Sequence, residues 1–287
     1  KEYPDILIQT FAYCSTEIAP KSVRPEPNIL IRWCDLYTYS DCYRPLTSEF
    51  NKARREQVQG WQATQAKLAI YDYSNMGILN APYFRPPRIE TTVNAIAPDM
   101  RFYRDSGATS YYTEMQTYLH LHPQNFVDLQ IWLSYQLAND PDLDEDALIE
   151  THMTHHYGPA TKPMKRLLKE IRDAIAHCRQ PLFYITNPVR PYQTPAFIKR
   201  VLGFLREAQK MAPEGTAWRR RIDKELVTPL AVILNSPTLK TDADSPLNRE
   251  AAAREYEALR KNLIETYSPP EKREEFLKQL AETMSGF

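Results

Sequence analysis

The first 117 residues repeat one pattern four times, and this pattern restricts the fold more than any other feature of the chain. Each repeat is a short apolar run that ends in carboxylate or aromatic residues. The runs occupy residues 6–13, 28–37, 67–73 and 108–115. Helical or loop segments separate them, and such alternation is typical of βαβ units with a parallel sheet. We therefore predict four parallel strands whose functional groups collect at the C-terminal ends, where the following loops can surround a ligand.

Two of the separating segments have the spacing of crossover helices. Residues 48–65 open with Ser48, a candidate N-cap, and continue with apolar residues at helical intervals. Residues 88–107 form the second segment, and Gly107 is the expected stop signal. Pro98 lies inside that segment and predicts a kink or a break, because proline cannot donate the backbone hydrogen bond.

The remainder of the chain has the pattern of a helical region. Apolar residues recur at helical spacing in seven segments, and only residues 181–186 resemble a further strand. We divide the chain into a four-stranded α/β part at 1–117, the helices that follow it with a helical extension at 118–190, and a C-terminal helical domain at 191–287. The predicted fold class is α/β followed by an all-helical region.

Composition excludes several classes of function. Thirty-six basic residues balance thirty-six acidic ones, so the net charge typical of a nucleic-acid or anionic-membrane binder is missing. No apolar run approaches the roughly 20 residues that span a bilayer. The glycine-poor sequence contains neither a phosphate-binding loop nor a GxSxG nucleophile elbow. The four scattered cysteines predict buried thiols instead of a disulfide framework.

Three carboxylates follow predicted strands at corresponding positions: Asp35, Asp72 and Glu114. At the C-terminal ends of parallel strands they are expected to face one pocket. Two carboxylates that face each other across a pocket can divide the work of glycosidic cleavage, one as acid and the other as nucleophile or base. Any single one of these carboxylates could equally well be a helix cap or accept a loop hydrogen bond. The hypothesis of a glycosidase therefore depends on the occurrence of all three at corresponding positions.

Aromatic residues gather around the same strand ends. Sugar rings present apolar C–H faces that stack on aromatic planes, so an aromatic pocket with polar edges suits a carbohydrate. Core packing is the preferred interpretation for aromatic residues inside strands, such as Trp33 and Tyr71. His152 and His156 are four residues apart on a predicted helix, a spacing that can bind one metal ion, but no third ligand is identifiable. We therefore predict neither a metal site nor a cofactor.

Several motifs carry a family resemblance over roughly residues 3–180. They are PDILIQTFAY near the start, RPEPNILIRWC followed by CYRPL, the Trp61 of GWQ, IYDY at 70–73, and the helical stretch LQIWLSYQLANDPDLDEDALIETHMTHHYGPA. With these motifs the chain resembles the bacterial family called domain of unknown function 4838. Members of that family look like glycoside hydrolases and are related to the α-glucuronidase and hexosaminidase barrels. His156 departs from the YYG-x-A ending that is usual in the family.

The resemblance implies a (β/α)8 barrel of which these four strands are the second half. An upstream N-terminal segment would then complete the barrel, and a periplasmic or extracellular location would follow. By the same resemblance, Asp35 and Asp72 are candidate base or water-orienting groups, and Glu114 is the third catalytic candidate. The residues expected to contact the substrate or support its pocket are Tyr13, Tyr37, Tyr73, Arg32 and Trp132.

The expected function is that of a glycoside hydrolase-like protein that acts on a polysaccharide or glycan, including one that contains uronic acid. The alternative is a non-catalytic carbohydrate-binding or scaffold protein that keeps the aromatic pocket and lacks the acid. Two carboxyl groups roughly 5–10 Å apart across an open pocket favour hydrolysis. Carboxylates that pair with arginines favour binding or a structural role. A helical interaction module would instead require an exposed apolar patch on the C-terminal helices.

Overall fold

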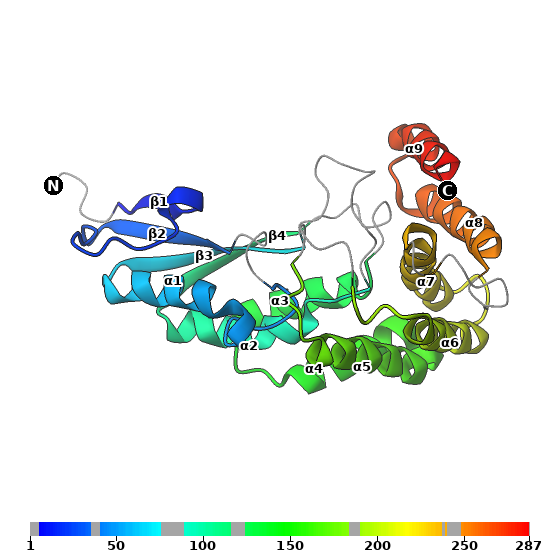
Figure 1. Ribbon diagram of the computed structural model, residues 1–287, viewed down its shortest axis with the longest axis horizontal. Coiled ribbons are helices and arrows are strands. Elements are labelled where there is room, and N and C mark those ends of the chain that lie inside the picture. Colours follow the sequence, from blue (N-terminus) through cyan, green and yellow to red (C-terminus); the bar gives the residue numbers. More distant parts are fainter. Residues whose placement is uncertain are drawn as a thin grey trace.

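The computed structural model of the chain describes residues 6–35, 41–75, 89–115, 124–183, 190–236, 239 and 248–286. The molecule is a mixed α/β structure in which a small parallel sheet lies at one end and a large helical body lies at the other. Figure 1 shows helices α1 and α2 below the sheet and the helices α7, α8 and α9 stacked at the opposite end of the molecule.

The sheet contains four strands in the order β1-β2-β3-β4, and every neighbouring pair is parallel. The four predicted runs are thereby confirmed as strands. They are β1 (Ile8–Ala12), β2 (Ile29–Asp35), β3 (Lys67–Asn75) and β4 (Ala108–Met115). Residues 181–183, the described part of the fifth apolar run, are not a strand. The mixed α/β class is confirmed, and the four strands form an open parallel sheet.

Both predicted crossover helices are present. Helix α1 (Lys52–Ala63) follows a 3-10 turn at Glu49–Asn51, and the Ser48 side chain accepts a hydrogen bond from the Phe50 N–H at the start of that turn. Helix α2 (Val93–Asp105) ends before Gly107, whose φ of +83° suits glycine. The expected break at Pro98 is wrong, because α2 continues through it. Pro98 is only the sixth residue of the helix, so the helix loses a single intrahelical donor there.

All seven predicted segments of the second half form helices. Side chains of Asp144, Thr194, Thr216 and Asn248 accept hydrogen bonds from the first turns of four of them, which fixes where these helices begin. Short 3-10 turns also occur at Cys14–Thr16, Gly158–Ala160 and Pro270–Lys272. The helices are α3 (Val127–Asn139), α4 (Glu145–Tyr157), α5 (Thr161–His177), α6 (Pro195–Met211), α7 (Ala217–Asn235), α8 (Arg249–Tyr267) and α9 (Arg273–Ser285).

The described helices include none that combines the length and the apolar character needed to cross a membrane. All four cysteines lie in the described part of the chain and are thiols, as predicted. Cys34 and Cys178 are buried and Cys42 is half-buried, whereas Cys14 is exposed in the 3-10 turn that follows the edge strand β1. The prediction of burial is therefore wrong for Cys14.

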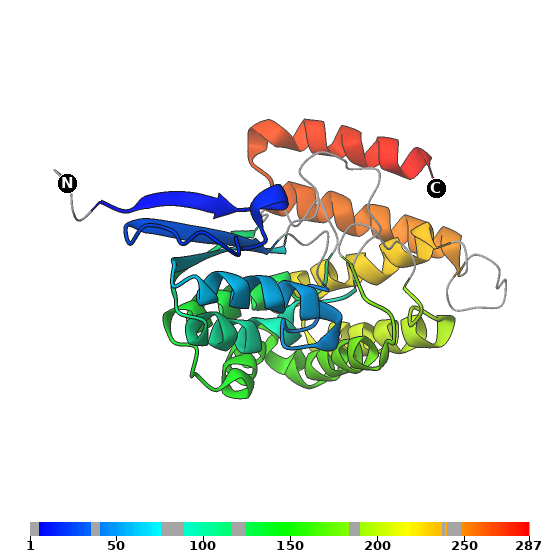
Figure 2. The same cartoon turned by 60° about the vertical axis from the view of Figure 1, so that its left-hand side comes forward.

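Two apolar clusters form the core, and α2 contacts both. The smaller cluster packs β1–β3 against α1 and includes Tyr103 of α2. The larger cluster runs from Val93 and Met100 of α2 through the helical body to α9. Figure 2 shows the sheet and the helical body as adjoining parts of the molecule. Helix α2 therefore fixes the position of the sheet relative to the helices that follow.

Candidate functional site at the strand ends

The two faces of the sheet have different characters. Side chains alternate between the faces along each strand, and register partners on parallel strands share a face. Trp33, Ile70 and Tyr111 are register partners, and all three contact the core beneath the sheet. The opposite face carries Phe11, Arg32, Cys34, Tyr71, Tyr73, Tyr112 and Glu114. We call the first the helix-covered face and the second the aromatic face.

Asp35 lies on the helix-covered face and is tied to both helices beneath it. Its Oδ1 lies 3.2 Å from Nε of Arg54 on α1, and its Oδ2 accepts a hydrogen bond from the Tyr103 hydroxyl on α2 at 3.4 Å. The buried Arg54 also donates to the Cys34 carbonyl at 2.6 Å and lies 4.6 Å from the Trp33 ring centroid. The carboxylate of Asp35 is therefore the anchor of a buried arginine at the end of β2.

Asp72 is the register partner of Asp35 and shares its face. Its Oδ2 accepts a hydrogen bond of 2.6 Å from the Tyr111 hydroxyl. Burial, with the nearby charge of Asp35 as a second cause, raises the pKa of Asp72 to about 7. A carboxyl with such a pKa can hold a proton near neutral pH, which is the property of a general acid, but it lies beneath the sheet.

Glu114 lies on the aromatic face, opposite to both aspartates. Its Oε2 accepts a hydrogen bond of 2.9 Å from the Tyr71 hydroxyl. A bulge in the pairing of β3 and β4 explains this position: Leu68 pairs with Ala108, but Ile70 pairs with Tyr111, so β4 contains one extra residue. One extra residue exchanges the faces for every later side chain of the strand. The prediction that the three carboxylates face one pocket is therefore wrong.

Five aromatic rings cover the aromatic face beside Glu114. The ring centroids of Tyr71 lie 4.7 Å from Tyr112, 4.9 Å from Tyr73 and 6.1 Å from Phe11. Tyr13 follows β1 and lies 6.5 Å from Tyr73. The rings of Phe11 and Tyr112 remain 47% and 48% exposed, although they lie on a sheet. Tyr13 and Tyr73 thus lie beside each other, and Tyr71, expected to be a core residue, is at the centre of the group.

The other predicted contact residues do not all lie on the aromatic face. Arg32 lies on the aromatic face, in register with Phe11 and Ala69. Tyr37 lies outside the described residues. Trp132 is on α3, packs against the helical core and lies 5.5 Å from the His152 ring, so it is not brought to the aromatic face.

The two histidines of α4 form a stacked pair. The ring centroids of His152 and His156 are 4.6 Å apart, and His156 Nε2 lies 3.5 Å from Oδ2 of Asp128, which also binds Lys224. Burial lowers the pKa of His152 to about 4. Within the described ranges, no group of three or more His, Cys, Asp or Glu residues is arranged to hold a metal ion.

Sequence reasoning missed the buried arginines that tie loops to the helical body. Arg44 forms an ion pair with Asp41 and donates to the carbonyls of Ile175 and Cys178 at 2.6 and 2.5 Å, so it closes the C-terminal end of α5. Arg190 forms a buried ion pair with Glu90. Arg44 contacts carbonyls that lie 131 and 134 residues further along the chain, and Glu90 and Arg190 are also distant in sequence, so no local sequence pattern reveals either network.

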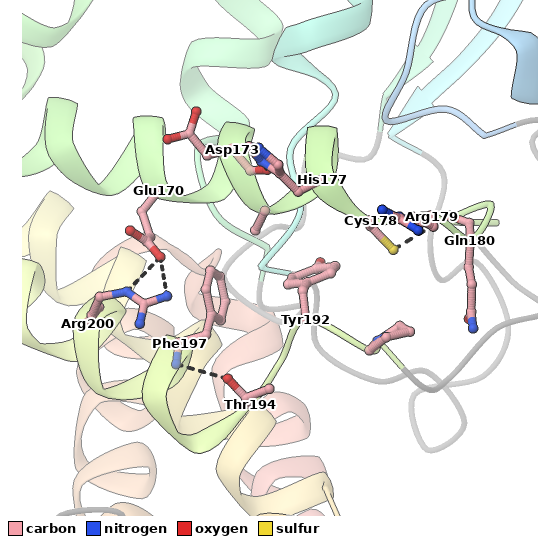
Figure 3. A pocket seen from close by; sticks show the side chains of 12 residues that line it. Glu170, Asp173, His177, Cys178, Arg179, Gln180, Tyr192, Thr194, Phe197 and Arg200 are labelled. Carbon is pink, nitrogen blue, oxygen red and sulfur yellow. Dashed lines mark hydrogen bonds and ion pairs between the residues drawn. The ribbon is translucent and has the colours of Figure 1, made fainter.

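A groove lies between the end of α5 and the start of α6. This groove has a volume of about 490 Å³ and is lined by residues that include Tyr192, Phe197 and His177. Figure 3 shows Glu170 and Arg200 paired at its rim, where Arg200 Nη2 lies 2.7 Å from Glu170 Oε1. Glu170 and Arg200 thus neutralise each other at the groove. The rings of Tyr192 and Phe197 contact each other edge to face, with their centroids 5.3 Å apart.

The parallel sheet, its covering helices and the polar strand ends define an α/β protein with a candidate ligand site on one sheet face. A family model described as "Domain of unknown function (DUF4838)" matches residues 1–169, and the chain belongs to that family. The match covers all four strands and extends into α5. Comparisons with curated proteins and with solved structures gave no match.

Proposed function

We propose that this protein binds a carbohydrate on the aromatic face of the sheet. The observation that carries the proposal is the group of five aromatic rings, Phe11, Tyr13, Tyr71, Tyr73 and Tyr112, on a sheet face where two of the rings are nearly half exposed. An exposed group of aromatic side chains of this size is unusual on a protein surface and often marks a binding site.

The chemistry of the rings favours a sugar over a purely apolar ligand. Four of the five are tyrosines, which offer a flat apolar plane and a hydroxyl on the same side chain. The pKa of Tyr71 is raised, first by burial and then by Glu114, so its hydroxyl stays protonated and remains a hydrogen-bond donor. A sugar ring has the complementary arrangement, with C–H groups on its faces and hydroxyls at its edge.

Hydrolysis of the bound glycan is the second candidate function, and Glu114 favours it. Its carboxylate shares the aromatic face and accepts a hydrogen bond from the Tyr71 hydroxyl, which orients it, and a carboxylate is the group that serves as nucleophile or base in such reactions. Asp35, by contrast, is engaged with Arg54 beneath the sheet, which suits a supporting role. Glycosidic cleavage needs a second carboxyl group on the same pocket as Glu114. We propose that this group comes from another part of the full-length protein.

We further propose that the four strands belong to a (β/α)8 barrel completed by an additional segment. The parallel order β1-β2-β3-β4 and the helices on one face are those of half such a barrel. Residues 6–13, which include the edge strand β1, contain no charged residue, although exposed edges are usually protected by charges or proline. Ile6, Leu7 and Ile8 are all about half exposed there. In such a barrel Tyr73 and Glu114 would lie at the C-terminal rim, which is the end of the aromatic face where barrels of this kind bind their ligands.

Titration of a glycan panel with the full-length protein tests the proposed function. Tyr112→Ala removes an exposed ring from the aromatic face, and we expect a loss of roughly tenfold in affinity, because an aromatic contact contributes about 1 kcal/mol or more. Tyr135→Ala is the matched control, since Tyr135 is 68% exposed on α3. Calorimetry should give unchanged affinity for the control. Absence of glycan binding, or equal losses in both variants, would contradict the proposal. Glu114→Gln should abolish any hydrolysis and leave binding intact.

A further inference from the structure

Two of the four cysteines lie at the same end of the aromatic face. Cys34 is buried on β2, whereas Cys14 is exposed in the 3-10 turn that directly follows β1. Ala12 and Trp33 are the last register partners of the two strands. Tyr13 keeps an extended backbone, with φ of −144° and ψ of 138°, so it continues β1 beside Cys34. Cys14 is the next residue and therefore lies next to the end of β2.

The backbone of Cys14 turns its thiol toward Tyr13. Its φ of +51° lies in the left-handed region, which residues other than glycine rarely adopt. The alternation of side chains along β1 ends there, and the Cys14 thiol lies within hydrogen-bond reach of the Tyr13 hydroxyl. The Tyr13 ring approaches that of Tyr73 across the intervening strand β2. Burial raises the pKa of both phenols, and the nearby Cys34 thiol adds to that rise. Both thiols are thus neighbours of Tyr13.

The separation of the two cysteines suits a disulfide. Neighbouring strands lie about 4.8 Å apart, and a disulfide joins Cα atoms that are roughly 4.4–6.8 Å apart. Burial raises the pKa of the Cys34 thiol to about 11, Arg32 and Arg54 oppose this rise, and the nearby Cys14 adds to it. Adjacent positions at the ends of two paired strands therefore bring an exposed thiol and a buried thiol together.

We propose that Cys14 and Cys34 are a redox-active pair that forms a reversible disulfide between the end of β1 and β2. The oxidant is a low-molecular-weight disulfide such as glutathione disulfide. The exposed Cys14 thiolate attacks one of its sulfurs and releases one glutathione thiolate. The Cys34 thiolate then attacks the Cys14 sulfur and releases the second. Two protein thiols are oxidised, one glutathione disulfide is reduced, and the two thiol protons end on the two glutathiones.

The disulfide would link the part of the sheet that has the fewest other links. Strand β1 pairs only with β2, and the described connection between them contains a short 3-10 turn and no α-helix. A disulfide across this connection restricts the unfolded chain and so favours the folded state. Oxidation therefore fixes the end of β1, and with it Tyr13, at the rim of the aromatic face.

Peptide mass spectrometry on the full-length protein tests the pair. After treatment with glutathione disulfide and alkylation of the remaining thiols, we expect a peptide that links Cys14 to Cys34 and that dithiothreitol separates. Cys14→Ser and Cys34→Ser should each abolish this peptide. Cys42→Ser is the matched control, because Cys42 is a half-buried thiol on the segment before α1, and it should leave the link unchanged.

Thermal unfolding measures the consequence of the link. The oxidised wild type should melt on the order of 5 °C higher than the reduced protein, and Cys14→Ser should remove this difference. The inference is overturned if oxidation of the wild type stops at a glutathione adduct on Cys14, or if Cys14 links to another cysteine. Equal melting temperatures of the linked and reduced wild type would overturn the stabilising role. If Cys34→Ser does not fold, the wild-type product and Cys14→Ser decide the question.

Discussion

At the scale of single residues, the environment of each carboxyl group decides its chemistry. Asp35 and Asp72 occupy equivalent register positions, but Asp35 contacts a buried guanidinium and Asp72 contacts a neutral phenol. Burial raises the pKa of Asp72 to about 7, with the nearby charge of Asp35 as the second cause, and the hydrogen bond from Tyr111 opposes this shift only in part. The same sequence pattern, an apolar run followed by aspartate, therefore places two carboxyl groups in two different environments.

The raised pKa of Asp72 predicts a specific dependence of stability on pH. Between about pH 4 and pH 7 the folded protein keeps a proton that the unfolded chain loses, so the free energy of unfolding falls as the pH rises through this window. Asp72→Asn removes this term and still accepts the hydrogen bond from Tyr111. We expect the free energy of unfolding of the variant to rise, relative to that of the wild type, by on the order of 4 kcal/mol between pH 4 and pH 8.

Denaturant unfolding at several pH values measures this difference. Asp173→Asn, which removes an exposed carboxyl on α5, is the control, because its ion pair with Lys169 is on the surface and contributes little. The interpretation of Asp72 is wrong if the two variants show the same pH profile relative to the wild type.

At the scale of elements, two glycines end helices by different means. Gly107 follows α2 with a φ of +83°, and a Cβ atom there would meet no other atom within 4 Å. Gly158 ends α4 with a φ of +51°, and a Cβ atom would lie 2.4 Å from the ring of Trp218 on α7. The first glycine is required by backbone conformation alone. The second is required by conformation and by the close packing of α7 against the end of α4.

Alanine substitutions separate these two requirements. Gly107→Ala should cost about 1 kcal/mol through backbone strain. Gly158→Ala should cost about 3 kcal/mol, because the Trp218 ring must also move. Chemical denaturation measures both losses, and the emission spectrum of Trp218 should shift only in the Gly158 variant. In a Trp218→Ala background the two glycine substitutions should cost nearly the same, and a persistent difference would show that the ring is not the cause.

At the scale of the whole molecule, the sheet is the least covered part. Helices α1 and α2 cover one face, the aromatic face is open among the described residues, and the five-residue strand β1 presents an uncharged edge. The Ile8 N–H donates to the Asn28 carbonyl at 2.8 Å, and alternate residues of a parallel strand point to the same side. The backbone groups of Gln9 and Phe11 therefore point away from β2, toward the position of a further strand.

Hydrogen exchange in the full-length protein tests whether a further strand pairs there. We expect the amides of Gln9 and Phe11 to be as protected as those of Ile8 and Thr10, which face β2. A further strand is excluded at this edge if Gln9 and Phe11 exchange at the rate of an unstructured loop while Ile8 and Thr10 remain protected.

Local sequence signals determined where the elements begin and end. The apolar runs became β1–β4, the seven periodic segments became α3–α9, and Ser48 and Gly107 mark boundaries as predicted. These features depend on backbone preferences, side-chain period and capping, which act over a few neighbouring residues. The match to DUF4838 likewise follows from the sequence.

Only the tertiary structure decided which side chains meet. Nothing local to β4 shows that it contains a bulge, because the bulge exists only relative to the pairing with β3. That single extra residue places Glu114 among the tyrosines and away from Asp35 and Asp72. Arg54 reaches Asp35 across 19 residues, and Arg44 closes a helix more than 130 residues away. Register and long-range packing set these contacts, since both depend on elements that are neighbours in space and distant in sequence.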